Sequence, residues 1–117
     1  MSEIIEVNGI IDSESRSHSV QMHGLKIEDH IMVSDIENQL LHGSIEIFKN
    51  NPMGIMVGHR IAERLGLQIG DRVNLIGGIE NFRLRVAGIF ETGVSEIDKK
   101  RVNVKIMVFF LLILSPG

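Results

Sequence analysis

Residues 54–90 read GIMVGHRIAERLGLQIGDRVNLIGGIENFRLRVAGIF and contain most of the ordered pattern in the chain. The first apolar run of this stretch ends at Gly58. Ile61, Ala62 and Leu65 then recur at the three- and four-residue spacing that gives a helix one buried face. The pattern therefore predicts a strand that ends at Gly58 and a short helix directly after it.

Two turns are expected after this helix. Gly66 lies where the helix should end, because a residue without a Cβ can take the left-handed conformation that satisfies the last carbonyl groups. Gly70 and Asp71 follow in a tight turn, and the Asp71 carboxylate is more typical of a group that closes its own turn than of a general acid or base. We interpret these positions as structural turns, together with Gly58 and Gly88.

Apolar and polar residues alternate over residues 72–76 and 82–86, which predicts two half-buried strands. Gly77 and Gly78 join these strands as a hairpin. With Ile79, the two glycines form a candidate hairpin for contact with a partner.

The composition favours one small, mainly β domain. A chain of 117 residues can bury a single modest core, and the absence of Tyr and Trp leaves Ile, Leu, Val and Met to build it. The absence of cysteine excludes disulfide bonds, thiolate metal sites and thiol nucleophiles. We expect an α+β, mainly β fold, a β-rich barrel-like or sandwich domain with two short helices.

The charge argues against nucleic acid as a partner. The formal net charge is -3, whereas a phosphate-binding surface needs an excess of Lys and Arg on one face. Arg72, Arg83 and Arg85 do cluster locally. Strand alternation places Arg83 and Arg85 on the same exposed face, which favours a solvated sheet face or blunted edge over an anion site.

The first half of the chain predicts two strands and a second helix. A strand with a bulge or a kink is expected over residues 4–11, and a polar, hairpin-like connection over residues 12–19. A second strand from Val20 onward should pair back on the first. A helix capped by Ser34 or Asp35 should then end at Gly43. Residues 44–48 fit a short strand or an irregular apolar turn equally well.

Residues 106–114, IMVFFLLIL, form a continuous apolar run inside the tail 106–117. A membrane span needs roughly 20 such residues, so this run is too short to cross a bilayer alone. Three interpretations remain open: a buried central strand, an uncovered edge strand that makes a homo-oligomer contact, or an extension that is not native to the fold.

The sequence contains no recognisable catalytic, cofactor-binding or metal-binding motif. No pair of histidines has the i, i+3 or i, i+4 spacing of a helical metal site, no serine lies in a G-x-S-x-G elbow, and no glycine-rich loop is followed by Lys-Ser/Thr. We therefore expect neither enzyme activity nor a metal site. The residues considered were His18, His23, His30, His42, His59, Ser34, Ser44, Ser95 and the carboxylates of Glu28, Asp29, Glu96 and Asp98.

Residues 54–76 and 82–104 resemble the extracytoplasmic domain of bacterial ABC transporter permeases of the lipoprotein-releasing LolC/LolE and MacB type. The family pattern runs from a strand ending in glycine, through a helix and a Leu-Gly-hydrophobic-x-x-Gly-Asp turn, to further strands and an acidic loop. With a weaker upstream part, the resemblance covers about residues 20–104. The positions that carry it are Gly58, Ala62, Leu65, Gly66, Gly70, Asp71, Val86, Gly88, Phe90, Glu96 and Asp98.

The resemblance implies a non-catalytic module, residues 1–105, that relays motion from the membrane to a substrate lipoprotein or a periplasmic carrier. It implies a parent permease with transmembrane helices on both sides, an ABC ATPase partner, and a position on the extracytoplasmic face of the inner membrane. The fragment itself is expected to be soluble, without a cofactor. Its first residues, MSEIIEVNG, lack the basic and apolar regions of a secretion signal.

Two features depart from the family pattern. The hairpin over residues 77–81 is short where carrier-docking permeases have a long one, which argues against carrier docking, and the tail leaves the pattern near Lys105. The motif Leu-Gly-x-x-x-Gly-Asp-x-Val over residues 65–73 also occurs in double-psi β-barrels. A free-standing β-barrel binding module of that type is the alternative function.

Overall fold

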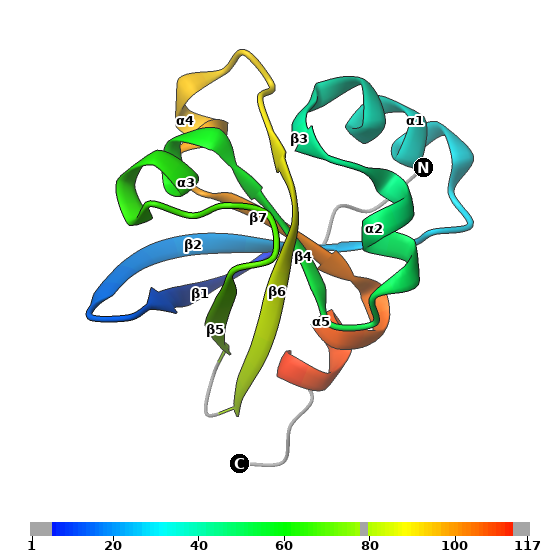
Figure 1. The fold of residues 1–117 in the computed structure, drawn as a ribbon. Helices are drawn as coiled ribbons and strands as arrows, with labels where there is room; N and C mark the ends of the chain where they lie inside the picture. The colour runs from blue at the N-terminus through cyan, green and yellow to red at the C-terminus, as the bar shows by residue number, and fades with distance from the viewer. Residues whose placement is uncertain (1–5, 78–79, 114–117) are drawn as a thin grey trace.

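The computed structural model describes residues 6–77 and 80–113. Figure 1 shows short helices placed around one strongly curved sheet. The strands are β1 (Glu6–Ser13), β2 (Arg16–Leu25), β3 (Leu40–Gly43), β4 (Gly54–Gly58), β5 (Arg72–Gly77), β6 (Glu80–Phe90) and β7 (Arg101–Lys105). The helices are α1 (His30–Gln39), α2 (Ile45–Asn50), α3 (His59–Leu65), α4 (Ser95–Asp98) and α5 (Ile106–Ile113).

The sheet closes on itself. Its strand order is β3-β6-β4-β7-β2-β1-β5, and β5 pairs with β6 as well as with β1, so every strand except β3 belongs to a closed ring. β6 can close the ring because it is long enough to pair with β5 over its first half and with β4 over its second half. Leu84 lies opposite Val73 of β5, whereas Val86 lies opposite Ile55 of β4. The expected α+β, mainly β class with a barrel-like sheet is confirmed, and the described residues add three helices to the two that were expected.

Two apolar clusters form the core. The larger one fills the barrel and includes Ile55 and Val57, whereas Met56 between them packs into a smaller cluster with Val33 of α1 and Phe48 of α2. Successive side chains of a strand point to opposite faces, so β4 contributes side chains to both clusters. All five residues of β4 are buried, which explains why this stretch has an unbroken apolar pattern.

The N-terminal hairpin differs from the expected strand, bulge and polar connection. β1 and β2 pair in continuous register from Glu6 opposite His23 to Ser13 opposite Arg16, with no shift at Asn8 or Gly9. β1 and β2 pair back on each other as expected, but the predicted connection over residues 12–19 is too long, because most of these polar residues extend the two strands. Polar side chains are compatible with a strand where its face meets solvent.

The helices of the first half begin at other residues than predicted. Asp29, and not Ser34 or Asp35, caps α1, since its carboxylate accepts a hydrogen bond from the Met32 amide at 3.1 Å. Residues 44–48 do not form a strand: the Ser44 hydroxyl accepts from the Ile47 amide at 3.1 Å and starts α2. A serine at such a cap satisfies an amide that the first helical turn leaves free.

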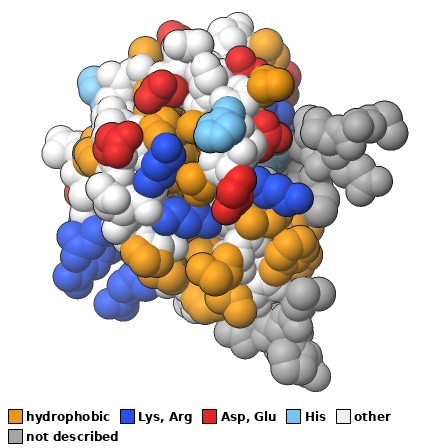
Figure 2. All heavy atoms as spheres, turned by 90° about the vertical axis from the view of Figure 1, so that its right-hand side faces the viewer, with side chains coloured by type: hydrophobic (Ala, Val, Ile, Leu, Met, Phe, Trp, Pro, Cys, Tyr) orange, Lys and Arg blue, Asp and Glu red, His pale blue; other side chains and the backbone are white. Residues whose placement is uncertain are grey.

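Residues 106–113 of the tail form a helix and not a buried strand. Val108, Phe109 and Leu112 of α5 are buried against the sheet, whereas Met107 and Leu111 are more than half exposed. An apolar run without polar residues does not distinguish a strand from a helix, so length and packing decided the outcome. Figure 2 is turned about the vertical axis of Figure 1, and it shows a group of hydrophobic side chains at the level where Figure 1 places α5. Among the described residues, no helix has the length and apolar character required to cross a membrane.

Candidate functional site

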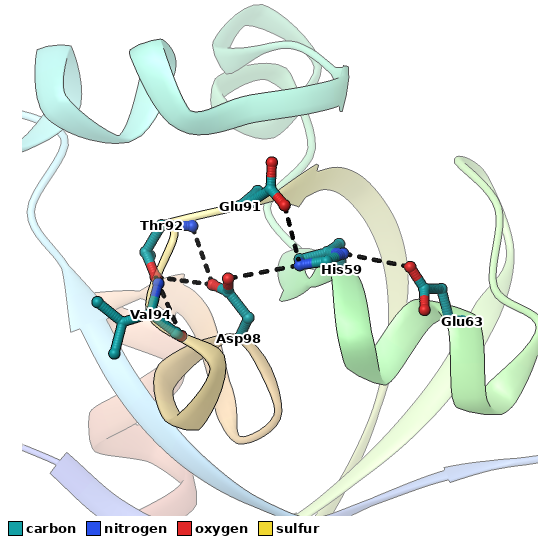
Figure 3. Close-up of polar contacts among 6 residues, drawn as sticks. All are labelled: His59, Glu63, Glu91, Thr92, Val94 and Asp98. Atoms are coloured by element: carbon teal, nitrogen blue, oxygen red, sulfur yellow. Dashed lines mark hydrogen bonds and ion pairs between the residues drawn. The ribbon is translucent and has the colours of Figure 1, made fainter.

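The start of α3 and the loop around α4 form the main polar cluster of the described residues. β4 and β6 are parallel neighbours with Gly58 opposite Phe90, so the residues that follow them, His59 and Glu91, leave the sheet at the same edge. β7 pairs with β4 in the antiparallel direction, which places Asp98, just before β7, at that edge too. Figure 3 shows the three side chains pointing toward one another.

Gly58 allows the end of β4 and the end of α4 to approach each other closely. A Cβ at Gly58 would overlap the backbone carbonyl of Asp98, so any larger residue would push α4 away from the end of β4. His59, the next residue, then lies beside the Asp98 carboxylate. The glycine interpreted from the sequence as a structural turn therefore also sets the separation of two polar side chains.

One imidazole contacts three carboxylates. The His59 Nε2 atom lies 3.3 Å from Glu91 Oε2 and 3.4 Å from Asp98 Oδ2. The other ring nitrogen, Nδ1, lies 3.3 Å from Glu63 Oε1, one helical turn along α3. Glu63 is largely solvent-exposed and Glu91 about half exposed, whereas the Asp98 side chain is only 2% exposed. The cluster therefore has a buried anchor and a rim open to solvent.

The Asp98 carboxylate is held by the loop that it closes. Its Oδ1 atom accepts hydrogen bonds from the Thr92 amide at 2.9 Å and from the Thr92 hydroxyl at 2.8 Å, and that hydroxyl in turn accepts from the Val94 amide at 3.1 Å. Burial of the carboxylate raises the pKa of Asp98, but the Thr92 hydrogen bonds, the charge of His59 and the Gly93 amide outweigh it and leave the pKa below its ordinary value of 3.8. Asp98 is therefore ionised at neutral pH.

Sequence analysis missed this cluster because its members lie far apart along the chain. His59, Glu91 and Asp98 place their ligand atoms within 4.8 Å of one another, a separation from which they could hold a metal ion. The parallel pairing of β4 with β6, which a local pattern does not reveal, brings His59 to Glu91. The one local signal was the Gly58-His59 junction between a strand and a helix.

Four of the five positions interpreted as structural turns, Gly58, Gly66, Gly70 and Asp71, lie at joins between elements, whereas Gly88 lies within β6. Gly66 ends α3 with φ 66° and ψ 38°, the left-handed region, and Leu67 donates to the Ala62 carbonyl at 2.8 Å. The Asp71 Oδ2 atom accepts from the Gln68 amide at 2.8 Å, and the Gly70 amide donates to the Val86 carbonyl at 2.8 Å. The turn after α3 thus hydrogen-bonds both to itself and to β6.

The other predicted positions lie elsewhere in the fold. Gly88 lies in β6, where a Cβ would press on side chains of Leu40 and Met56. Gly77 ends β5, and the rest of the candidate contact hairpin, Gly78 and Ile79, lies outside the described residues. Neither Gly77 nor Gly88 belongs to the His59 cluster.

Basic residues gather next to the cluster as well as at the arginines singled out from the sequence, where Arg72 lies opposite Arg85. Arg83 and Arg85 are exposed along β6, as expected of a solvated sheet face. A hollow of about 590 Å³ lies between β2, α3 and the residues after α4. It is lined by His18, Ser19, Arg60, Glu63, Arg64, Lys99 and Lys100.

Two curated proteins resemble most of the chain in sequence. The chain is 30% identical over 105 residues to the lipoprotein-releasing system transmembrane protein LolC in each of two strains of Xylella fastidiosa. Each match covers 81% of this chain but 25% of LolC, so the chain spans about a quarter of the curated relatives that it matches. No family model matches the sequence.

Two solved structures share the fold. The extracellular domain of the noncanonical ABC-type transporter YknZ from Gram-positive bacteria aligns with a TM-score of 0.64 and 14% identity, covering 92% of this chain and 55% of that one. The periplasmic region of MacB from Actinobacillus actinomycetemcomitans aligns with a TM-score of 0.65 and 13% identity, covering 97% and 51%. Together with the LolC match, they confirm the resemblance stated from the sequence, to the extracytoplasmic domain of ABC transporter permeases of the LolC and MacB type.

Proposed function

We propose that this chain is a non-catalytic extracytoplasmic module of an ABC transporter permease that takes part in lipoprotein release. The observation that carries the proposal is the LolC match over 81% of the chain. The fold shared with the YknZ and MacB domains supports a position outside the cytoplasmic membrane. We take residues 1–105, with α5 packed against them, as the working module and the parent permease, its ATPase subunit and a lipoprotein as its partners.

The closed sheet supports a mechanical role. β6 bonds to β5 and β4, and the ring continues through β7, β2 and β1, so each of these strands is hydrogen-bonded on both sides. Strands paired on both edges slide only if rows of hydrogen bonds break together, and each such bond is costly to leave unmade when buried. A barrel of this kind moves as one body and relays a displacement from the membrane to a bound partner.

The experiment uses the complete open reading frame that contains this chain. It is expressed in its native host with an affinity tag, and membranes are separated from the soluble fraction. The proposal expects the product in the inner membrane, this segment degraded by protease added from the extracytoplasmic side, and an ATPase that co-purifies. A product in the soluble fraction without an ATPase would overturn the proposal and favour the free-standing double-psi type module.

Lipoprotein release is tested separately. Proteoliposomes that contain the purified permease and its ATPase are loaded with a lipoprotein and given ATP. Release of the lipoprotein into the soluble phase that depends on ATP is the expected result. ATP hydrolysis without release would leave the chain in a permease but overturn the lipoprotein assignment.

A further inference from the structure

We propose that His59 Nε2, Glu91 Oε2 and Asp98 Oδ2 bind one divalent transition-metal ion of the zinc class, with a fourth position open to water or to a side chain of a partner. The inference is independent of the transport function. No metal-binding motif was recognised in the sequence, because the three ligands come from three separate segments and have no characteristic spacing along the chain.

Two of the three distances between the ligand atoms fit a tetrahedral ion, and the third, between the Glu91 and Asp98 oxygens, is within 4.8 Å. Zinc binds imidazole nitrogen and carboxylate oxygen at about 2.0–2.2 Å, so two ligands of a tetrahedral site lie about 3.3–3.5 Å apart. The separations of 3.3 Å from Nε2 to Glu91 and 3.4 Å from Nε2 to Asp98 match that edge. They are longer than the 2.7–2.9 Å or so of a charge-assisted hydrogen bond.

The proton count also favours an ion. Nε2 of a histidine carries at most one hydrogen, and that hydrogen cannot point along both contacts to Glu91 and Asp98. A cation placed between the three atoms attracts all of them at once. It also reduces the repulsion between two carboxylates that approach the same nitrogen.

The groups behind the ligands are those that a metal site requires. A histidine ligand almost always donates its second ring N–H to a carboxylate, a carbonyl group or water, which fixes the ring and makes the ligand more basic. Glu63 Oε1, at 3.3 Å from His59 Nδ1, is placed for this role. The far oxygen of Asp98 is held by two hydrogen bonds from Thr92, so the near oxygen keeps its direction.

The donor set selects the class of ion. One imidazole nitrogen with two carboxylate oxygens is typical of zinc and its first-row neighbours, whereas magnesium and calcium take oxygen ligands and more of them. Asp98 is buried and fixed, while Glu91 is about half exposed and free to close on an incoming ion. Such an ion would tie α3, the end of β6 and α4 together.

The test uses the full chain of 117 residues, freed of its affinity tag and treated with a chelator. ZnCl2 is titrated by calorimetry, and Co²⁺ is followed by its visible absorption, since a tetrahedral site gives intense bands. One ion per chain and tetrahedral Co²⁺ bands are expected, with no comparable heat for Mg²⁺. No saturable Zn²⁺ binding, or Mg²⁺ binding of equal affinity, would overturn the proposal.

Variants locate the ion. His59→Ala and Glu91→Gln, at side chains that are 14% and 48% exposed, should weaken Zn²⁺ binding by about 100-fold or more, and Glu63→Gln by about 10-fold. His18→Ala and Glu96→Gln are the matched controls and should bind as the original chain does. Circular dichroism verifies that each variant is folded. Equal affinity in His59→Ala and the original chain, or a loss in His18→Ala, would place the ion elsewhere and overturn the assignment.

Discussion

Gly58 and Asp98 are in direct backbone contact, because an added Cβ at Gly58 would overlap the Asp98 carbonyl group. This contact joins the end of β4 to the last residue of α4 and sets the position of the Asp98 carboxylate beside His59. A position that a sequence pattern marks only as the end of a strand thus decides the geometry of the polar cluster.

Gly58→Ala should therefore destabilise the protein although its φ of -63° suits alanine. Overpacking against backbone costs about 1–3 kcal/mol of the free energy of unfolding, because the backbone has to shift. Urea denaturation measures this cost. Hydrogen exchange of the Thr92 amide, which donates to Asp98, should become faster. Gly66→Asn is the control, since asparagine tolerates the left-handed conformation and should leave that amide protected.

Phe109→Ala should destabilise the protein by about 3–5 kcal/mol, because the ring is completely buried and its loss leaves a cavity in the core. Met107→Ala, at a residue of α5 that is 60% exposed, should change the stability by about 0.5 kcal/mol or less. Urea denaturation of both variants measures the difference. Equal effects would contradict the packing of α5 on the sheet.

Asp29→Ala should cost about 1 kcal/mol of stability, because it removes the side chain that caps the first turn of α1. Ser34→Ala, at the cap expected from the sequence, should stay within about 0.5 kcal/mol of the original chain, since Ser34 lies inside the helix. Thermal unfolding followed by circular dichroism compares the two. A larger loss for Ser34→Ala would favour the later helix start.

Lys105 should make the stability depend on pH in the alkaline range. Burial lowers the pKa of Lys105 below its ordinary value of 10.5, so between the folded pKa and 10.5 the unfolded chain binds more protons than the folded one. The free energy of unfolding contributed by this group therefore rises with pH across that window. The penalty of burying the charge is fully present below the folded pKa.

Comparison of the original chain with Lys105→Met isolates this group. Urea denaturation from neutral pH to pH 10.5 should show the original chain gaining stability relative to the variant as the pH rises. The ammonium also donates to the Lys49 carbonyl at 2.8 Å and lies 5.7 Å from the centre of the Phe48 ring, so a constant offset between the two proteins is expected. A difference that falls with pH would contradict the assigned direction.

The sequence predicted the elements whose pattern is local. The strand ending at Gly58, helix α3, and strands β5 and β6 are confirmed, because alternation and helical spacing directly reflect which side of each element is buried. The apolar composition likewise indicated one small β-rich domain. These features depend on residues at most a few positions apart.

The sequence was misleading where one pattern fits two structures. Polar residues 12–19 extend β1 and β2, and the caps at Asp29 and Ser44 compete with other residues of similar chemistry. The apolar tail suits a helix and a strand equally, since neither period leaves a polar face. Contacts with the rest of the fold decided each of these cases.

Only the tertiary structure decided how the ring closes and which polar groups meet. β6 reaches β5 with one half and β4 with the other, a pairing between segments far apart in the sequence. The same parallel pairing brings His59 to Glu91, and the Gly58 contact adds Asp98. Local propensity fixes the elements because it depends on neighbouring residues, whereas the site depends on register and close approach, which exist only after the chain has folded.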